Sequence, residues 1–297
     1  MQTRHEHLPP RLLLTLAGLS IAWGFNWTAL KVSLAEVSPW TFRSLCLGAG
    51  SGVLFAVLRL GGQPLGVPRG QWGRLTLLAL FNITSWNILI AFGVPMIPSG
   101  RAAILAYTMP VWSIPLSIWM LGEKFTARRA AGLILGMAGM ALLLSEDFAT
   151  LRAAPLGTLL ILCGAFMWGL GTVLQKRFPV TMPLGAYTAW IMLIGGVPIF
   201  AGAAVFDLGR AFSDISLVAA LGVLYNVVVA FAWAHWAWLK LVTALPVSVF
   251  SISMLLIPVV GVLSGMLFLG ERPSWQEYAA LALVLASLWS VAAPRHG

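Results

Sequence analysis

Two stretches of the sequence repeat one pattern: SIAWGFNWTALK at residues 20–31 and AFMWGLGTVLQK at residues 165–176. Each contains a Trp-Gly pair, a hydroxyl-bearing side chain and a closing lysine, in the same order and in otherwise apolar surroundings. The pairs begin at Trp23 and Trp168, about half the chain length apart. This echo predicts that the chain consists of two related halves.

The composition is that of a membrane protein. Hydrophobic residues make up 60% of the chain and charged residues 9%, whereas about 25% of a soluble domain is charged. Apolar runs long enough to cross a bilayer, about 20 residues each, follow one another with short linkers between them. We predict ten spans, at residues 12–31, 39–59, 74–95, 99–121, 127–145, 156–175, 183–205, 215–238, 243–268 and 275–293.

The net charge of +9 comes from basic residues scattered between the apolar runs. Because they form no basic stripe or aromatic-basic module, the sequence favours a lipid bilayer as the partner and predicts no nucleic acid. With the N-terminus inside, twelve lysines and arginines fall in cytoplasmic segments and five on the opposite side. Cytoplasmic loops carry the excess of positive charge, so we expect both termini in the cytoplasm.

Further echoes preserve the order and nearly the same spacing. They are Phe81-Asn82 with Tyr225-Asn226, Met109-Pro110 with Ile257-Pro258, and LGEK at 121–124 with LGER at 269–272. Each half, 1–147 and 148–297, therefore reads as a five-span unit. Since five is odd, the second unit must cross the membrane in the opposite sense. Inverted repeats of this kind are typical of alternating-access transporters with a site near the midplane, although a duplication can also supply a bundle that transports nothing.

The two five-span halves, the Trp-Gly pair in the first span of each and the LGE sequence ending the fourth span resemble the drug/metabolite transporter superfamily. Within it the chain resembles the EamA-type exporters over essentially its whole length, and more narrowly their YddG-like branch of aromatic amino acid exporters. The resemblance implies an all-α integral membrane basket of ten helices in a bacterial inner (plasma) membrane. Spans one to four and six to nine would surround a central cavity, with spans five and ten at the edge.

Polar and aromatic side chains inside the spans are the candidates for substrate contact, because polar groups are costly at membrane depth. An aromatic lining with a few amide and hydroxyl groups suits a ligand that is partly apolar and partly polar. The predicted substrate-binding residues are Trp23, Asn26, Asn82, Trp86, Tyr107, Trp168, Tyr225, Asn226 and Ser251. The alternative is helix packing for the tryptophans and hydrogen bonds between helices for the asparagines.

Two prolines recur in corresponding spans, Pro110 in the fourth and Pro258 in the ninth. Proline removes a backbone donor and bends a helix, so we predict a kink or gating bend at each, with a tolerated kink as the alternative. Arg43 is the one basic residue clearly inside a span. It could contact an anionic group, or it could snorkel to the nearby external end.

No aspartate or glutamate occupies the middle of a predicted span. Carboxylate-driven antiport of cationic drugs is therefore disfavoured. We predict export of amino acids, chiefly aromatic and bulky apolar ones, by facilitated diffusion through a protein that functions as a monomer. The alternative is export of another metabolite or drug, such as a nucleobase or sugar conjugate, with or without proton coupling.

An enzyme is disfavoured because the sequence lacks GxSxG, HExxH and paired intramembrane carboxylates, and His235 is the only histidine outside the tails. His235 is expected to pack rather than to carry protons. We predict no catalytic residue, no metal and no cofactor.

Overall fold

The computed structural model describes residues 9–93, 96, 105–145, 154–207, 215–269 and 275–292, and every element assigned in these ranges is helical. Six helices are long and apolar enough to cross a membrane: Pro10–Leu34, Pro39–Leu60, Trp72–Gly93, Pro155–Arg177, Leu184–Phe206 and Leu217–Ala244. Shorter apolar helices run over Met109–Leu121, Val247–Gly261 and Tyr278–Ser287. The chain is thus a multi-pass helical membrane protein.

Several helices start with residues that suit a first turn. Proline lies in the first two positions of α1 (Pro10–Leu34), α2 (Pro39–Leu60) and α9 (Pro155–Arg177), where its missing N–H has no helical partner to lose. The side chain of Ser38 also caps α2 by accepting from the Thr41 amide at 3.3 Å. At the other end of a helix, Gly122 of the LGEK sequence has φ 66° and ends α6 (Met109–Leu121), a left-handed conformation that glycine adopts without strain.

The third and eighth predicted spans each contain a π-helix. The first consists of α3 (Trp72–Ala79), η1 (Leu80–Ser85) and α4 (Trp86–Gly93). The other consists of α11 (Leu217–Tyr225), η3 (Asn226–Trp233) and α12 (Ala234–Ala244). π-Helices are rare and occur most often at functional sites. The predicted linker around residue 240 is wrong, because α12 continues to Ala244.

The fourth and ninth predicted spans are interrupted. In the fourth, residues 105–106 are helical, Tyr107 and Thr108 form a turn, and α6 begins at Met109. In the ninth, α13 (Val247–Ser253) and α14 (Leu256–Leu269) are separated by a turn at residues 254–255. The predicted kinks are therefore breaks between helical segments, and each proline lies just inside the segment that follows.

These breaks have a local cause. A proline cannot donate to the carbonyl four residues before it, which is that of Ala106 for Pro110 and that of Met254 for Pro258. The chain instead tightens, with the Thr108 amide bonded to the Leu105 carbonyl and the Leu255 amide to the Ile252 carbonyl, both at 3.1 Å. Both interrupted spans thus have a tighter turn just before the proline.

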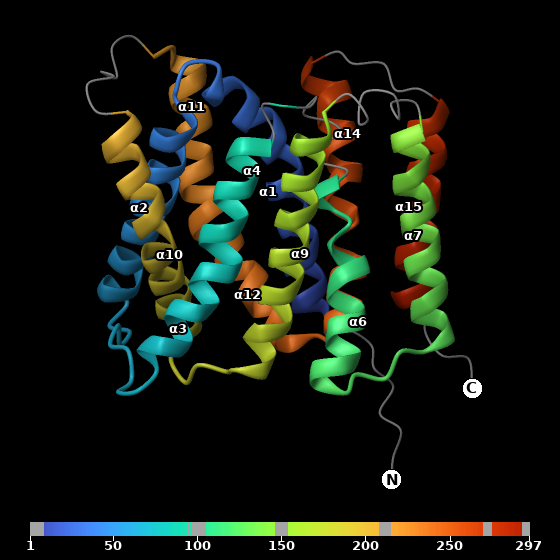
Figure 1. The fold of residues 1–297 in the computed structure, drawn as a ribbon, viewed down its shortest axis with the longest axis horizontal. Helices are drawn as coiled ribbons and strands as arrows, with labels where there is room; N and C mark the ends of the chain where they lie inside the picture. The colour runs from blue at the N-terminus through green and yellow to red at the C-terminus, as the bar shows by residue number, and fades with distance from the viewer. Residues whose placement is uncertain are drawn as a thin grey trace.

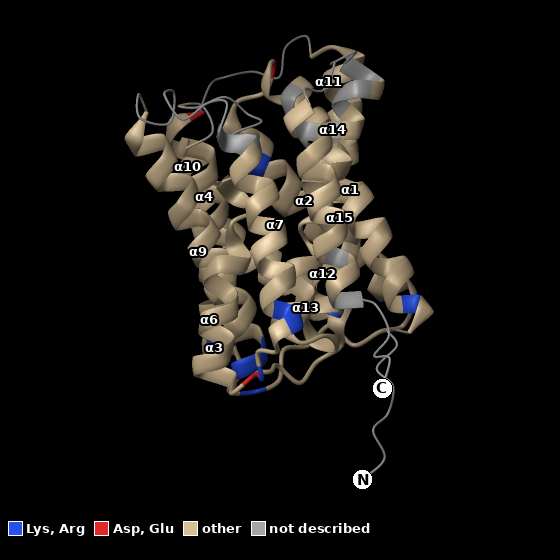
Figure 2. Ribbon diagram, turned by 90° about the vertical axis from the view of Figure 1, so that its right-hand side faces the viewer, with Lys and Arg blue, Asp and Glu red and all other residues tan. Residues whose placement is uncertain are grey.

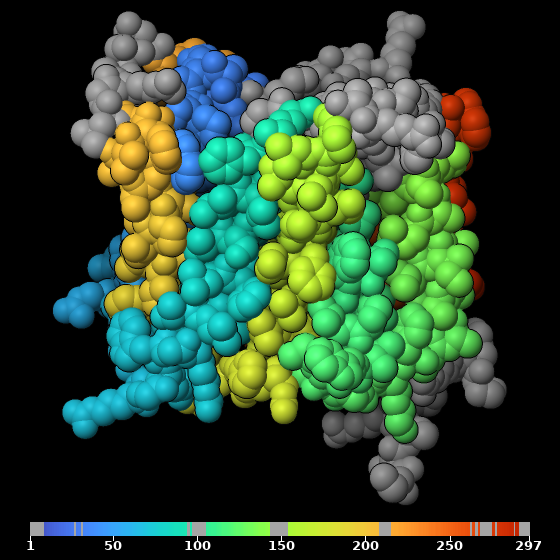
Figure 3. Space-filling view, in the orientation of Figure 1, coloured from blue at the N-terminus to red at the C-terminus, as the bar shows by residue number. Residues whose placement is uncertain are grey.

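The helices stand side by side, as Figure 1 shows. Helix α2 packs against α10 (Leu184–Phe206), α1 against α14 and α11, and α9 against both α4 and α6. Helices α7 (Ala127–Ser145) and α15 (Trp275–Ala292) pair with each other at one edge. Figure 3 shows the face on which α3, α4, α9, α6 and α7 cover the interior.

The distribution of apolar side chains fits a bundle surrounded by lipid. Large side chains such as Trp119, Leu217 and Val205 are exposed on the outside of the bundle, while Trp238 and Phe250 are fully buried inside it. A soluble protein does not surround itself with so many large exposed apolar side chains. In a membrane the outer surface faces lipid and is itself apolar.

Acidic residues at helix ends connect separate helices. Glu123, in the LGEK sequence after α6, accepts hydrogen bonds from the Val247 amide at 2.7 Å and the Ser248 hydroxyl at 3.3 Å. It therefore caps the first turn of α13, in the second half of the chain, and its carboxylate lies 3.9 Å from the ammonium of Lys176. Glu123 therefore has a structural role, joining the end of α6 to α13 and α9. Its counterpart Glu271 lies outside the described residues.

Candidate substrate-binding cavity

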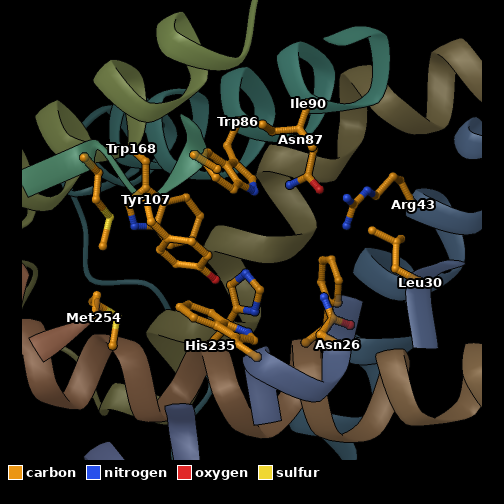
Figure 4. A pocket seen from close by; sticks show the side chains of 14 residues that line it. Asn26, Leu30, Arg43, Trp86, Asn87, Ile90, Tyr107, Trp168, His235 and Met254 are labelled. Atoms are coloured by element: carbon orange, nitrogen blue, oxygen red, sulfur yellow. The ribbon is translucent and has the colours of Figure 1, made fainter. Parts of the chain in front are cut away.

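A cavity of about 720 Å³, counting the open space at its mouth, lies among the helices. It is nearer the end of the bundle where α1 and α4 finish and α2 begins. None of the described side chains of α7 and α15 lines it. The described residues that line it are Trp23, Asn26, Leu30, Arg43, Trp86, Asn87, Ile90, Ala106, Tyr107, Met109, Trp168, Phe231, His235 and Met254. Figure 4 shows this cavity from close by.

Tryptophans from the two halves form one wall of the cavity. Trp168 of α9 contacts Trp23 of α1 edge to face, with ring centroids 5.8 Å apart, and its ring lies 4.9 Å from that of Trp86. The two tryptophans of the repeated sequence pattern therefore meet in the structure. Edge-to-face contacts are a favoured arrangement of aromatic rings, so these contacts stabilise the wall.

The π-helix η3 supplies a backbone acceptor to the same wall. The carbonyl of Ala230 accepts from the Trp23 indole at 3.0 Å and lies 3.1 Å from Nδ1 of His235. The His235 ring also stacks on Phe231, with centroids 4.8 Å apart. His235 is 4% exposed. The packing role expected for His235 agrees with these contacts, although the residue also lines the cavity.

The opposite side of the cavity carries polar groups beside the apolar Leu30 and Ile90. Arg43 of α2 is only 8% exposed, and its guanidinium carbon lies 5.7 Å and 5.8 Å from the ring centroids of Phe42 and Phe231. The structure records no ion pair between Arg43 and any described acidic residue. In Figure 4 its side chain and that of Asn87 point toward each other across the cavity from Trp168 and Tyr107. Arg43 therefore does not snorkel to the surface.

Two asparagines on this side carry oxygens without partners. Asn87 donates from Nδ2 to the Ile83 carbonyl at 2.8 Å, which fixes the orientation of its amide because only nitrogen can donate. Its Oδ1, like that of Asn26, is buried and has no hydrogen-bond partner among the described residues. Buried acceptors normally have a hydrogen-bond donor. These two oxygens are exceptions, and each can accept a donor from a bound molecule.

Of the nine predicted substrate-binding residues, five line this cavity together: Trp23, Asn26, Trp86, Tyr107 and Trp168. The other four do not belong to the lining. Asn82 is fully buried and connects to α9, where it donates to the Trp168 carbonyl at 3.3 Å and accepts from Gln175 Nε2 at 3.1 Å.

The remaining three also make helix contacts. The Tyr225 hydroxyl donates to the Ala22 carbonyl at 2.8 Å, and Asn226 donates to the Gly222 carbonyl of its own helix at 3.0 Å. Ser251 forms a hydroxyl pair with Ser113 at 2.7 Å, joining α13 to α6.

Several lining residues were missed as candidates, chiefly Asn87, Phe231 and Met254. Asn87 lies in FNITSWN, the most polar stretch of the third span. Its polar side chain therefore marked it as a candidate, but regular α-helical spacing did not place it on the cavity side. Met254 occupies the turn before α14, at the position that corresponds to the lining residue Ala106, four residues before the proline. That correspondence was available from the repeat. Among the described residues no group of three or more His, Cys, Asp or Glu could hold a metal ion.

A helical bundle that spans a membrane and encloses an aromatic and polar cavity defines the class of small-molecule membrane transporters. The EamA-like transporter family matches residues 11–145 and again residues 155–293. The chain belongs to this family. It is therefore a transporter and not an enzyme.

Several individual proteins are similar over nearly the whole chain. The "Uncharacterized transporter YoaV" of Bacillus subtilis is 22% identical over 88% of this chain and 90% of its own. The "Probable amino-acid metabolite efflux pump" of Escherichia coli is 25% identical over 91% of this chain and 90% of its own. A crystal structure 19% identical to this chain superposes with a TM-score of 0.79, covering 95% of this chain and 97% of that one. That last likeness shows the shared fold alone.

Proposed function

We propose that this transporter exports amino acids, chiefly aromatic and bulky apolar ones, as the YddG-like aromatic amino acid exporters do. The observation that carries the proposal is the two-sided cavity, with a tryptophan wall facing a lone cation and amide groups. An amino acid with a large apolar side chain has the same division into an apolar and a charged part. The name of the Escherichia coli relative, an amino-acid metabolite efflux pump, agrees with this substrate class.

The proposed mechanism is alternating access by two inverted five-helix repeats, residues 1–147 and 148–297, with ten membrane spans in all. Two features support it. The family matches the chain twice, and the described halves share their irregularities, a π-helix in the third and eighth spans and a break in the fourth and ninth. Discontinuous helices at a repeat interface commonly form transporter sites. Tyr107 and Met254, beside the two breaks, both line the cavity.

We place the protein in a bacterial inner membrane with both termini in the cytoplasm. In Figure 2 most of the described lysines and arginines gather at one end of the bundle, the end at which α12 finishes. Cytoplasmic segments carry such an excess, so the cavity lies toward the external side. Because one chain supplies the described lining, we propose that the monomer is the functional unit.

Transport by facilitated diffusion fits the charges of the cavity. No aspartate or glutamate is among the described lining residues, and proton-coupled carriers commonly rely on buried acidic groups that bind and release the proton. The substrate gradient would then supply the driving force.

The test is efflux of labelled phenylalanine from proteoliposomes. Trp168→Ala removes the centre of the aromatic wall, and Trp119→Ala, which changes a side chain 81% exposed on the bundle surface, is the matched control. We expect efflux from the wild type and the control, with a large loss in Trp168→Ala and no change when a protonophore is added. No efflux above that of empty liposomes would overturn the proposed substrate, and dependence on a pH gradient would overturn facilitated diffusion.

A further inference from the structure

We propose that Arg43 binds the carboxylate of the transported molecule and that Asn87 and Asn26 accept from its ammonium group. The cavity would then select molecules with a free α-carboxylate and reject aromatic amines of the same shape. This inference rests on the proposed function, because it names which chemical groups of an amino acid the polar side of the cavity reads.

The first step is the charge of Arg43. A guanidinium stays protonated in proteins, and burying a charge without an anion is costly. The two ring contacts of Arg43, to Phe42 and Phe231, are near the 6 Å limit for cation–π attraction. They compensate only part of that cost. Since no described acidic side chain pairs with Arg43, the structure leaves a place for an anion that arrives with the substrate.

The second step is geometry. The planar guanidinium matches a carboxylate through two parallel hydrogen bonds. Arg43 has no hydrogen bond to a described residue, and Figure 4 shows its nitrogens directed into the cavity. By contrast Arg59, on the same helix, is exposed at the last turn of α2.

The third step concerns the ammonium group. The unpartnered Oδ1 atoms of Asn87 and Asn26 are acceptors on the same side of the cavity as Arg43. A bound ammonium would supply the N–H donors that these two oxygens lack. They are neutral, however, so a ligand with an ammonium and no carboxylate would bring a second positive charge next to Arg43. Like charges repel strongly in a poorly solvated site, which disfavours an amine.

The arrangement also orients the substrate. Arg43 and Asn87 lie across the cavity from Trp168 and Tyr107. A phenylalanine bound by its carboxylate and ammonium on the first side directs its ring toward the tryptophan wall. Specificity for the polar end and for the side chain therefore comes from different helices.

The experiment compares three ligands that differ by one group: phenylalanine, phenethylamine, which lacks the carboxylate, and 3-phenylpropionate, which lacks the ammonium. Each is measured in proteoliposomes with the wild type, Arg43→Gln, Arg43→Lys and the control Arg59→Gln. The readout is the ratio of phenylalanine to phenethylamine transport within each variant. This ratio does not depend on how much protein is folded.

We expect the wild type and Arg59→Gln to prefer phenylalanine and to be inhibited by 3-phenylpropionate. Arg43→Gln should lower the ratio about 10- to 100-fold, the effect of losing a charge-assisted pair, and should lose inhibition by 3-phenylpropionate. Arg43→Lys keeps the charge without the fork, so its ratio should fall between the two. If Arg43→Gln does not fold, the transport ratio of Arg43→Lys tests the proposal instead.

An unchanged ratio in the Arg43 variants, or a wild type that carries both ligands equally, would overturn the carboxylate site while leaving amino acid export intact. If the wild type carries no phenylalanine, the proposed function fails. Quenching of tryptophan fluorescence by 3-phenylpropionate then tests Arg43 separately. Quenching that Arg43→Gln abolishes supports the site, and quenching that persists in Arg43→Gln, or no quenching in the wild type, overturns it.

Discussion

Asn82 and Asn226 occupy corresponding positions in the two halves but make different contacts, and this difference predicts different effects of the same substitution. Asn82 makes two hydrogen bonds to α9, whereas Asn226 donates only within its own helix. Hydrogen bonds between membrane helices contribute on average about 0.6 kcal/mol each. Asn82→Ala should therefore lose about 1.2 kcal/mol from these bonds alone.

A second contribution comes from the partner left behind. Gln175 is 3% exposed and its Oε1 already has no partner among the described residues. Without Asn82, the Gln175 amide nitrogen also loses its acceptor, which costs about 1 kcal/mol or more. Asn82→Ala should thus lower the free energy of unfolding by about 2 kcal/mol. Asn226→Ala should lower it by about 0.5 kcal/mol, because its hydrogen bond is local.

The measurement is reversible unfolding in mixed micelles as the SDS fraction rises, followed by tryptophan fluorescence. The double variant Asn82→Ala with Gln175→Leu is the internal check. Because it removes the orphaned amide, it should recover about 1 kcal/mol relative to Asn82→Ala. The KM for phenylalanine should not change in Asn82→Ala, since this side chain does not line the cavity. The reasoning fails if Asn226→Ala is as damaging as Asn82→Ala, or if the double variant is no more stable than the single one.

Three further outcomes follow from other contacts. Trp23→Phe keeps a ring but removes the indole donor, so the KM for phenylalanine should rise several-fold with little change in melting temperature; an unchanged KM contradicts this. A Cβ at Gly171 would lie 2.4 Å from the side-chain amide nitrogen of Asn82, while a Cβ at Gly52 meets nothing within 4 Å. Gly171→Ala should therefore lower the melting temperature clearly, and Gly52→Ala should not. Hydrogen bonds from the side chain and backbone of Ser216 lower the pKa of Glu36. Their contribution to folding stability is therefore present above the pKa of the unfolded state, about 4.3, and is lost as pH falls through the pKa of the folded state. The melting-temperature advantage of the wild type over Glu36→Gln should therefore shrink in acid, and a constant difference from pH 7 to pH 3 would refute it.

The order and limits of the helices could be predicted well because the signal for each span is a long apolar run. The predicted 39–59 and 127–145 agree with α2 and α7 to within a residue. The boundary between the eighth and ninth spans was wrong because Lys240 looked like a loop residue. Its ammonium instead lies 4.9 Å from the ring of Trp236 within α12, an arrangement in which the aliphatic stem stays in the helix surface.

The lining of the cavity was harder to predict because the backbone leaves the α-helical register where the lining begins. With regular spacing, Asn82 and Trp86 share one helix face. In the structure η1 widens the turn between them, so Asn82 meets α9 while Trp86, Asn87 and Ile90 line the cavity. Spacing rules assume 3.6 residues per turn, so they misplace the side chains that follow a π-helix. The sequence left open whether Arg43 turns inward, because a basic residue near a span end can equally well snorkel.

The cap that Glu123 places on α13 has a consequence for how the carrier divides its time between conformations. α13 has only seven residues, too few to be stable without its contacts, and a carboxylate from the other half satisfies its first amides. If the halves separate at this end, as the proposed alternating access requires, the cap and the Lys176 contact are lost together. Each 1.4 kcal/mol held in this contact shifts the ratio of the two conformations tenfold. Under the proposed mechanism, the hydrogen bonds of Glu123 would therefore contribute to how often the carrier faces the cytoplasm, and with it to the rate at which substrate is loaded.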